Sequence, residues 1–389
     1  MSKQPDKFLS KPERIMLVGM MLDADYTGAN ESRERAFAAA MAEAEELVRA
    51  TGGELVCRQT AKRDRAHPAL FVGTGKAEEL AQTVRDRQIE LAVFNHELTP
   101  TQERNLEKAL QCRVLDRVGL ILAIFAQRAQ SQEGRLQVEL AQLTHLSGRL
   151  VRGYGHLQSQ KGGIGLKGPG ETQLETDRRL IAQKITALKK RLEAVRRQRA
   201  TRRKAREHGS LPTFALVGYT NTGKSSLFNR LTKADVLAKN QLFATLDTTA
   251  RRLYLNPSAS IILTDTVGFV RDLPHSLVAA FSATLEETAL ADVLLHVVDA
   301  AHPEHERQID DVNEVLREIG AGGVPQIVLY NKTDLLPPEE RRFGILRDTR
   351  GRAVAANISV KTGEGLDALR EILAEHAVSD GLNGYKPAS

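Results

Sequence analysis

Residues 218 to 225 carry the clearest chemistry in the sequence. They read GYTNTGKS, follow the apolar run 214–217, and precede the helix-like run SLFNRLT. In such a loop the glycines let backbone N–H groups surround phosphates, the lysine reaches the β and γ phosphates, and the serine hydroxyl binds Mg²⁺. We therefore expect Lys224 to act in catalysis and Ser225 to ligate the metal.

A second apolar run, residues 261–264, ends in the sequence DTVG at residues 265–268. At the end of a strand this motif senses the γ phosphate. Asp265 would hold Mg²⁺ through water, and the Gly268 N–H would meet the γ phosphate. We expect Gly268 to take part in catalysis for that reason.

The segment FATLDTT, residues 243–249, lies between these two motifs and has no strong helix pattern, as expected of a switch loop. One of its threonines must complete the Mg²⁺ shell when the γ phosphate is present. Thr245 is our choice as metal ligand and catalytic residue, with Thr248 or Thr249 as the alternative.

The identity of the base follows from NKTD at residues 331–334, directly after the apolar run 327–330. The Asp334 carboxylate can accept from both guanine N–H groups, and a site built for such donors rejects an analogue lacking them by about 10⁴ to 10⁵. Asn331 would brace this loop against the phosphate loop, and the Lys332 stem would lie over the base. Residues 359–361, SVK, would place a serine and backbone amides near guanine O6. GTP is therefore the expected substrate.

These motifs need an α/β scaffold, and residues 211–378 are expected to form a P-loop GTPase domain followed by a short tail, 379–389. Residues 1–130 alternate the apolar runs RIMLVGM, GELVCRQT, ALFVGTG and IELAVF with helix patterns, which predicts a small α/β domain with a largely parallel sheet. In that domain GTGK, residues 73–76, follows an expected strand and opens a helix. It lacks two defining positions of a phosphate loop, so we interpret it as an ordinary turn, with a second nucleotide or RNA contact as the alternative.

Between residues 131 and 208, apolar residues recur at coiled-coil spacing in two stretches, 136–150 and 181–195. The glycine-rich connector 152–173 separates them, which predicts an antiparallel helical hairpin with a long loop at its tip. Dense arginine and lysine between residues 178 and 206 make the second helix strongly basic. This density favours a polyanion such as structured RNA as partner, over the alternative of a solvated linker helix.

The composition sets broad limits on the class of protein. The 389 residues, 41% hydrophobic and 27% charged, suffice for about two or three domains with cores, and the net charge is +6. No apolar signal core or stretch of about 18 apolar residues occurs, so we expect a cytoplasmic protein without a membrane span. We also expect a monomer. Cys57 and Cys112 are too far apart for a zinc pattern and fit a reducing compartment, where we expect both to be buried.

Taken together, the chain resembles the HflX family of ribosome-associated GTPases, within the Obg-HflX group. The resemblance spans nearly the whole chain and rests on GYTNTGKSSLFN (218–229), FATLD (243–247), DTVGF (265–269), NKTD (331–334), GGIGLKGPGETQLETDRR (162–179) and VGTGKAEEL (72–80). It implies a GTPase that binds the ribosome, chiefly the large subunit and its rRNA, and splits stalled ribosomes. The nucleotide contacts that it implies are Gly218, Tyr219, Thr220, Asn221, Thr222, Gly223, Lys224, Ser225, Phe243, Ala244, Thr245, Leu246, Asp247, Asp265, Thr266, Val267, Gly268, Asn331, Lys332, Thr333, Asp334, Ser359, Val360 and Lys361.

Phe269 stands where many GTPases have a glutamine that orients the attacking water, so another group must position that water. We expect slow basal turnover that the ribosome stimulates. Asn221 resembles the asparagine with which some GTPases hold K⁺ beside the phosphates, which makes K⁺ a second expected cofactor besides Mg²⁺.

Two other functions stay open at this point. The first is a GTP-switched ribosome-assembly or RNA-processing factor, in which hydrolysis only resets binding. The second is a GTP-dependent regulator of a protein partner that docks on the hairpin. The second alternative leaves the arginine density unexplained and predicts little salt dependence.

Overall fold

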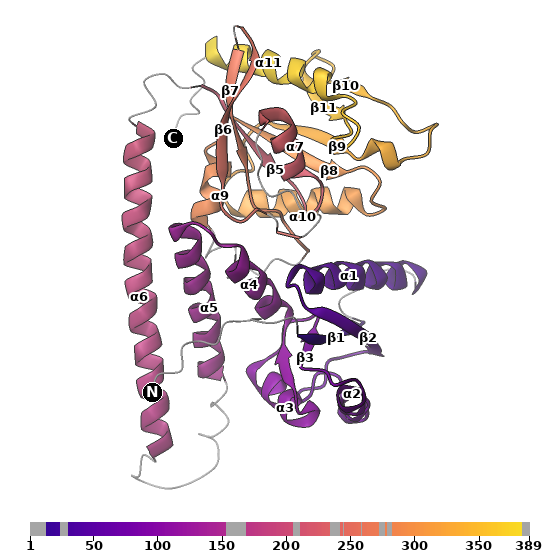
Figure 1. Cartoon of the computed structure of the whole chain (residues 1–389), viewed down its shortest axis with the longest axis vertical. Helices are drawn as coiled ribbons and strands as arrows, with labels where there is room; N and C mark the ends of the chain where they lie inside the picture. The colour runs from indigo at the N-terminus through magenta and orange to yellow at the C-terminus, as the bar shows by residue number, and fades with distance from the viewer. Residues whose placement is uncertain are drawn as a thin grey trace. The chain divides into compact units, whose positions relative to one another are not determined.

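The computed structural model describes residues 13–23, 30–152, 169–204, 211–233, 242–243, 245–257, 259–271, 277 and 282–382. The chain divides into two compact units. The first unit comprises Met1–Gln127 and Arg135–Glu193, and the second comprises Arg128–Gly134 and Ala194–Ser389. Each unit contains its own sheet (Figure 1). The domain boundaries expected from the sequence at residues 130, 208 and 378 stay a prediction.

The first unit is built on a four-stranded sheet of order β2-β1-β3-β4, in which every pair is parallel, as predicted. Its strands are β1 (Arg14–Leu22), β2 (Glu54–Arg63), β3 (Leu91–Phe94) and β4 (Arg113–Leu115). Its helices are α1 (Asn30–Ala50), α2 (Thr74–Arg87), α3 (Pro100–Leu110) and α4 (Arg117–Arg128).

Helices cover both faces of this sheet because β1 is apolar on both sides. Met16 and Val18 point to one face, where they share a core with Leu80 of α2 and Leu106 of α3. On the other face α1 approaches so closely that a methyl group on Gly19 would overlap Met41. Parallel strands buried on both faces read as continuous apolar runs, as β1 does.

Two expectations for this region were wrong. Residues 69–72 form no strand, because Phe71 has a φ of 60° and exchanges two backbone hydrogen bonds, 2.7 and 2.9 Å, with His67 in a tight loop. Cys57 and Cys112 are half-buried instead of buried. Cys57 lies on the edge strand β2 and Cys112 just before the edge strand β4, so both contact the core only from its margin. The strand β4 and the apolar helix α4 were not foreseen.

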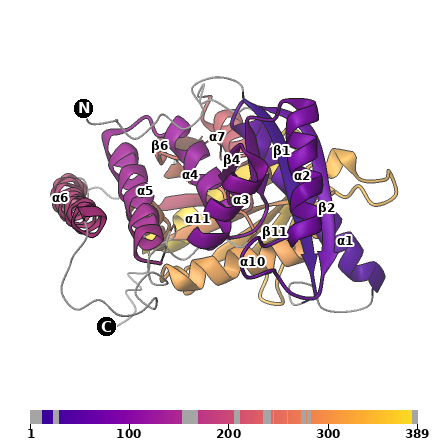
Figure 2. The ribbon, with the colours of Figure 1, turned by 90° about the horizontal axis from the view of Figure 1, so that it is seen from below.

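The helical hairpin consists of α5 (Gln132–Arg152) and α6 (Pro169–Lys204), which lie side by side (Figures 1 and 2). Leu140, Leu188 and Leu192 are buried between them, with Leu136, Leu143 and Ile185 partly buried around them. The connector is shorter than expected because α6 already begins at Pro169, and proline suits the first position of a helix. Most of the predicted tip loop, residues 153–168, lies outside the described residues.

The second unit is built on a seven-stranded sheet of order β10-β11-β9-β8-β5-β7-β6. The two edge strands pair antiparallel and the inner pairs are parallel. Its strands are β5 (Thr213–Val217), β6 (Thr249–Asn256), β7 (Ala259–Asp265), β8 (Val293–Asp299), β9 (Gln326–Asn331), β10 (Gly344–Arg347) and β11 (Ala353–Asn357). Its remaining elements are α7 (Lys224–Thr232), α9 (Ser282–Ala289), α10 (His305–Glu318), the 3-10 turn η2 (Thr333–Leu335) and α11 (Leu366–Leu382).

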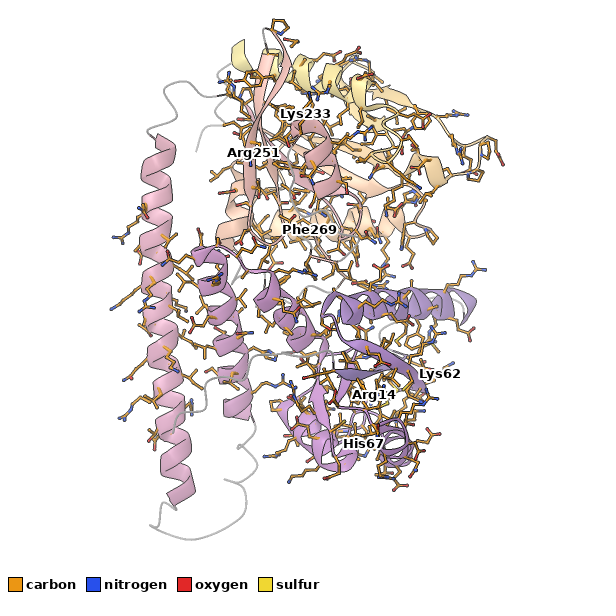
Figure 3. All side chains as sticks on the ribbon, viewed as in Figure 1. Arg14, Lys62, His67, Lys233, Arg251 and Phe269 are labelled. Atoms are coloured by element: carbon orange, nitrogen blue, oxygen red, sulfur yellow. The ribbon has the colours of Figure 1, made fainter. Side chains whose placement is uncertain are left out.

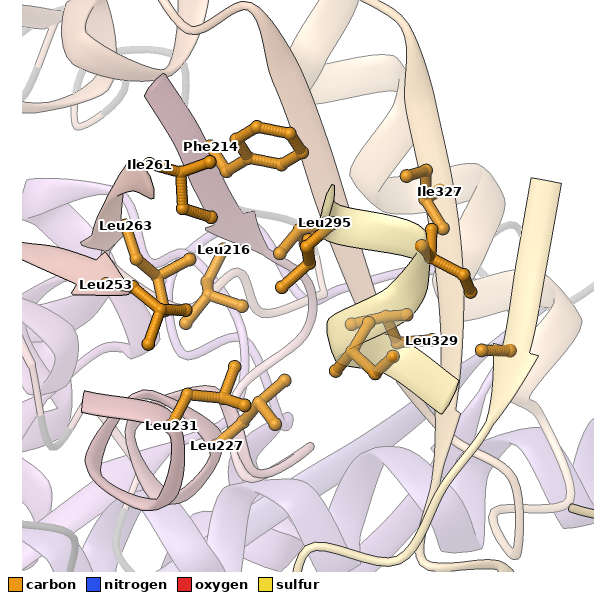
Figure 4. Close-up of a cluster of buried hydrophobic side chains, with 14 of the residues drawn as sticks. Phe214, Leu216, Leu227, Leu231, Leu253, Ile261, Leu263, Leu295, Ile327 and Leu329 are labelled. Atoms are coloured by element: carbon orange, nitrogen blue, oxygen red, sulfur yellow. The ribbon is translucent and has the colours of Figure 1, made fainter. Parts of the chain in front are cut away.

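The core of the second unit lies where α7 and α11 pack on one face of this sheet. Phe214 and Leu216 of β5 point into that core, while Leu227 and Leu231 of α7 close it from the other side (Figure 4). The carboxyl ends of the parallel strands β5, β7, β8 and β9 meet at one edge of the sheet, which is where α/β sheets bind ligands. The predicted nucleotide motifs of this unit follow strand ends, except FATLD, which precedes β6. Because β6 pairs antiparallel with β7, its first residue Thr249 lies opposite Asp265, so the fold gathers this motif at the same edge.

Candidate functional site

The loop after β5 has a backbone that only particular residues tolerate. Gly218 has a φ of 140° and packs against the carbonyl of Val297 in β8, and Gly223 has a φ of 101° just before α7. Asn221 also has a positive φ, 61°, and an exposed side chain. The loop therefore leads into the amino terminus of α7, where unpaired backbone N–H groups favour an anion.

Lys224, the first residue of α7, is 6% exposed. Its ammonium donates to the carbonyls of Gly218 (3.0 Å) and Tyr219 (2.6 Å), inside the loop itself. Burial lowers the pKa of Lys224 to about 8, although the nearby Asp265 carboxylate acts in the opposite direction. A buried ammonium is stabilised by an anion, and a phosphate in this loop would supply one.

Three oxygen-bearing side chains from three separate elements meet beside Lys224. The hydroxyls of Ser225 and Thr245 lie 2.7 Å apart, and each donates to the Asp265 carboxylate at 2.7 Å. Thr245 is thus the threonine of the 243–249 segment that reaches this cluster, whereas Thr249 begins β6 and pairs with the backbone of Asp265.

This cluster fits a small, hard cation. Asp265 is fully buried, its second carboxylate oxygen has no hydrogen-bond partner among the described residues, and its pKa is raised because burial outweighs the two hydroxyl donors. Hydroxyl and carboxylate oxygens are the ligands that such cations prefer. The described residues contain no group of three or more His, Cys, Asp or Glu side chains placed to hold a metal.

The segment after β7 is paired to the phosphate loop through its backbone. The Phe269 N–H donates to the Gly218 carbonyl (3.1 Å), and the Thr220 N–H donates to the Phe269 carbonyl (2.7 Å). A methyl group on Gly268 would lie 2.8 Å from the Thr220 methyl group and 3.0 Å from the Lys224 ammonium, so this close approach leaves little room for a side chain. The Phe269 side chain, labelled in Figure 3, is buried, with 2% of it exposed, and its phenyl ring can position no water.

The loop after β9 is joined to both of its neighbours. Asn331 donates to the Thr222 carbonyl in the phosphate loop (2.8 Å) and accepts from the Val360 N–H (3.0 Å). The Asp334 carboxylate accepts from the Ser359 hydroxyl (2.7 Å), which leaves it capacity for further donors. The structure therefore brings the phosphate loop, NKTD and the serine segment into one connected arrangement.

Lys332, in the same loop, pairs with a residue that the sequence reasoning missed. Its ammonium lies 2.7 Å from the carboxylate of Asp299, the last residue of β8. A signal was present in the sequence, because an acidic residue directly follows the apolar run VLLHVV at a strand end.

The other expected nucleotide contacts differ in how they are placed. Thr222, Thr266 and Thr333 are buried and hydrogen-bond to backbone carbonyls. Phe243, Leu246 and Val267 have buried side chains, so only their backbones could meet a ligand, while Lys361 is exposed and Ala244 lies outside the described residues.

Asp247, in the segment before β6, contacts the residues that precede α5. Its carboxylate accepts from the backbone N–H groups of Gln130 (2.8 Å) and Ser131 (2.7 Å) and also from the Ser131 hydroxyl. These residues all belong to the second unit, whereas α5 continues into the first unit from Arg135. Asp247 follows Thr245 by only two residues. The segment that carries Thr245 is therefore hydrogen-bonded to the beginning of the helical hairpin.

The second helix of the hairpin presents a basic surface. One face packs on α5, and the basic residues of the described part are exposed. They are Arg178, Arg179, Lys184, Lys189, Lys190, Arg191 and Arg197. Within the described part of the chain, no helix is both long and apolar enough to cross a bilayer.

Three family models match the chain in sequence. Residues 38–126 match the model described as GTP-binding GTPase N-terminal, residues 128–206 the GTP-binding GTPase Middle Region, and residues 213–332 the model of a 50S ribosome-binding GTPase. The matches follow one another along the two units and leave short segments unmatched between them.

Curated relatives named GTPase HflX cover most of the chain. The protein of Escherichia coli K12 is 52% identical over 333 residues, which is 86% of this chain and 78% of the relative. That of Magnetococcus marinus is 52% identical over 324 residues, 83% of this chain and 74% of the relative. That of Alkalihalophilus pseudofirmus is 42% identical over 361 residues, which is 92% of this chain and 84% of the relative.

A solved structure has a similar fold. The crystal structure of SsGBP in complex with GDP covers 95% of this chain and 100% of its own, with a TM-score of 0.51 and 24% sequence identity. At that identity the likeness concerns the fold alone.

Proposed function

Since this chain belongs to the HflX family of GTPases, we propose that it binds the large ribosomal subunit and splits stalled ribosomes. In this proposal the bound nucleotide, GTP or GDP, controls its affinity for the ribosome. The work of the protein then takes place in the cytoplasm.

The nucleotide part of the proposal assigns roles to the residues at the sheet edge. Lys224 and the Gly268 N–H contact the γ phosphate, and Asp334 accepts from the guanine edge. Ser225 and Thr245 bind Mg²⁺, with Asp265 holding it through water. The metal supplies positive charge where negative charge develops on the phosphate oxygens.

The observation that carries nucleotide control is the bond between Asp247 and the start of α5. Thr245 donates to Asp265 at the proposed metal site, and Asp247 accepts from the N–H groups of Gln130 and Ser131. One short segment therefore contacts both the metal site and the hairpin. GTPase switch loops are ordered by the γ phosphate and released after hydrolysis. Release of residues 245–247 would free the first turn of α5, which is how loss of the γ phosphate would reach the hairpin.

The ribosomal part of the proposal rests on charge. The exposed arginines and lysines of α6 form a basic surface, and RNA phosphates are the polyanions that such a surface fits. Binding that neutralises several phosphates weakens steeply with salt, which distinguishes rRNA from a protein partner.

Sedimentation of intact ribosomes with the protein and GTP tests the splitting step. We expect conversion of intact ribosomes to subunits with GTP and less conversion with GDP. Binding to the large subunit without conversion would favour the ribosome-assembly alternative. Absence of salt-sensitive binding to either subunit would contradict the ribosomal function and favour a protein partner.

A further inference from the structure

We propose that Asp299 is a positioning residue for guanine recognition, which acts by holding the Lys332 ammonium away from Asp334. The inference rests on the proposed role of residues 331–334 in binding the base. It adds a residue on a different strand to that site.

The Asp299 carboxylate is fixed at both oxygens. One oxygen accepts from the backbone N–H of Ala301 in the turn after β8 (3.1 Å). The other lies 2.7 Å from the Lys332 ammonium. The side chains of Asp299 and Lys332 are 18% and 28% exposed, so this pair is largely shielded from water and salt.

The pairing of the two strands sets this distance. Asp299 is the register partner of Asn331 across β8 and β9, so Lys332 leaves the sheet directly beside it. Lys332 itself has a φ of 63°, a left-handed conformation that turns the chain into η2. The backbone conformation of Lys332 and the Asp299 carboxylate together restrict the lysine side chain, whose four-carbon stem is otherwise flexible.

The restriction matters because Lys332 and Asp334 carry opposite charges in the same short loop. A free ammonium would compete with guanine for the Asp334 carboxylate. In the structure the lysine pairs with Asp299, and Asp334 accepts from the neutral Ser359 hydroxyl. Asp334 is therefore available to guanine, and the ordered lysine stem can cover the face of the base without a further loss of side-chain freedom.

The test uses Asp299→Asn, because its amide oxygen can still accept from the Ala301 N–H while the carboxylate charge that holds the Lys332 ammonium is lost. We expect the affinities for GTP and GDP to fall equally, by about 10- to 150-fold, the range for loss of one charge-assisted hydrogen bond. KM should rise by the same factor, with kcat at saturating GTP unchanged. Asp299→Glu should restore part of the affinity. The exposed Asp310→Asn on α10 is the matched control and should change neither parameter.

Lys332→Met separates this inference from the proposed base site. If Asp299 acts through Lys332, Asp299→Asn should cause no further loss of affinity in the Lys332→Met background. Full affinity in Asp299→Asn, or losses that add in the double variant, would overturn the inference while leaving the base site intact. Asp334→Ala tests the base site itself. If that variant binds GTP normally, the proposed role of the 331–334 loop fails, and the role of Asp299 fails with it.

Discussion

The carboxylate of Asp247 holds the first residues of α5 through Ser131, 116 positions earlier in the chain. Ser131 is in turn the amino-terminal cap of the helix, because its hydroxyl accepts from the Gly134 N–H (2.8 Å). Gly134 has no side chain, and a methyl group there would overlap the Asp247 carboxylate. The close approach of switch loop and helix therefore depends on a glycine in the first turn.

Gly134→Ala is predicted to uncouple the hairpin from the nucleotide. The added methyl displaces Asp247, so the GTP and GDP forms should bind the large subunit more nearly alike. Coupling free energies between sites usually amount to 5- to 150-fold, and we expect the ratio of the two affinities to fall by about tenfold. Binding assays with a non-hydrolysable GTP analogue and with GDP measure this ratio.

Gly148→Ala is the matched control on the same helix. Nothing lies within 4 Å of a methyl group at Gly148, so this change should raise helix stability by about 1 kcal/mol and leave the affinity ratio unchanged. Equal behaviour of the two variants would argue against coupling through Asp247.

Phe269→Gln is predicted not to speed hydrolysis. The side chain at this position is buried, so a glutamine would be held in the core without reaching the attacking water. Its unpaired amide would cost about 1 to 3 kcal/mol of stability. Single-turnover hydrolysis and thermal unfolding of the variant check both statements, and a basal rate raised several-fold would refute the first.

Hydrolysis is predicted to be faster in K⁺ than in Na⁺ buffers. Asn221 has an exposed side chain in the phosphate loop, where its amide oxygen can contribute to a site for a monovalent cation beside the phosphates. Asn221→Gly, which tolerates the positive φ at this position, should remove the difference between the two salts while leaving the affinity for GDP nearly unchanged. Equal rates in the two salts for the unaltered protein would exclude this role.

His296 is predicted to make the second unit sensitive to acid. It is 1% exposed in β8, and burial lowers its pKa from 6.5 to about 4. Because the folded pKa lies below the unfolded one, its contribution to stability is complete above pH 6.5 and is lost as the pH falls toward 4. The total is about 3 kcal/mol, of which about 2 kcal/mol is lost by pH 5.

The measurement is the free energy of opening of β8, obtained from amide hydrogen exchange at pH 7 and pH 5. His296→Leu should show a smaller decrease between the two pH values than the unaltered protein. The same decrease in both proteins would mean that other groups cause the acid sensitivity.

Short motifs at strand ends allowed much of the site to be predicted from the sequence. Lys224, Ser225 and Asp334 each lie in a contiguous pattern whose backbone geometry and chemistry are local. The order of these motifs then predicts the α/β domain that gathers them. Thr245 was the choice from the sequence, but Thr248 and Thr249 stayed open as alternatives, because the start of β6 depends on pairing with β7.

Contacts between distant segments could not be predicted in this way. Neither Asp247 nor Asp299 has a local pattern that indicates its partner, since each contact is set by how separate elements pack. Phe71 was misassigned for a related reason: its apolar neighbours suggest a strand, but the backbone conformation that closes the loop leaves no trace in hydrophobicity.

The most direct test of ribosome-controlled GTP hydrolysis is to measure turnover by the purified protein alone, with the small subunit, and with the large subunit, at two salt concentrations. We predict slow turnover alone and strong stimulation by the large subunit that weakens at the higher salt. In small GTPases a partner that completes the site raises the rate on the order of 10⁵-fold. Turnover that is equally fast without the large subunit, or stimulation that does not depend on salt, would contradict the proposal.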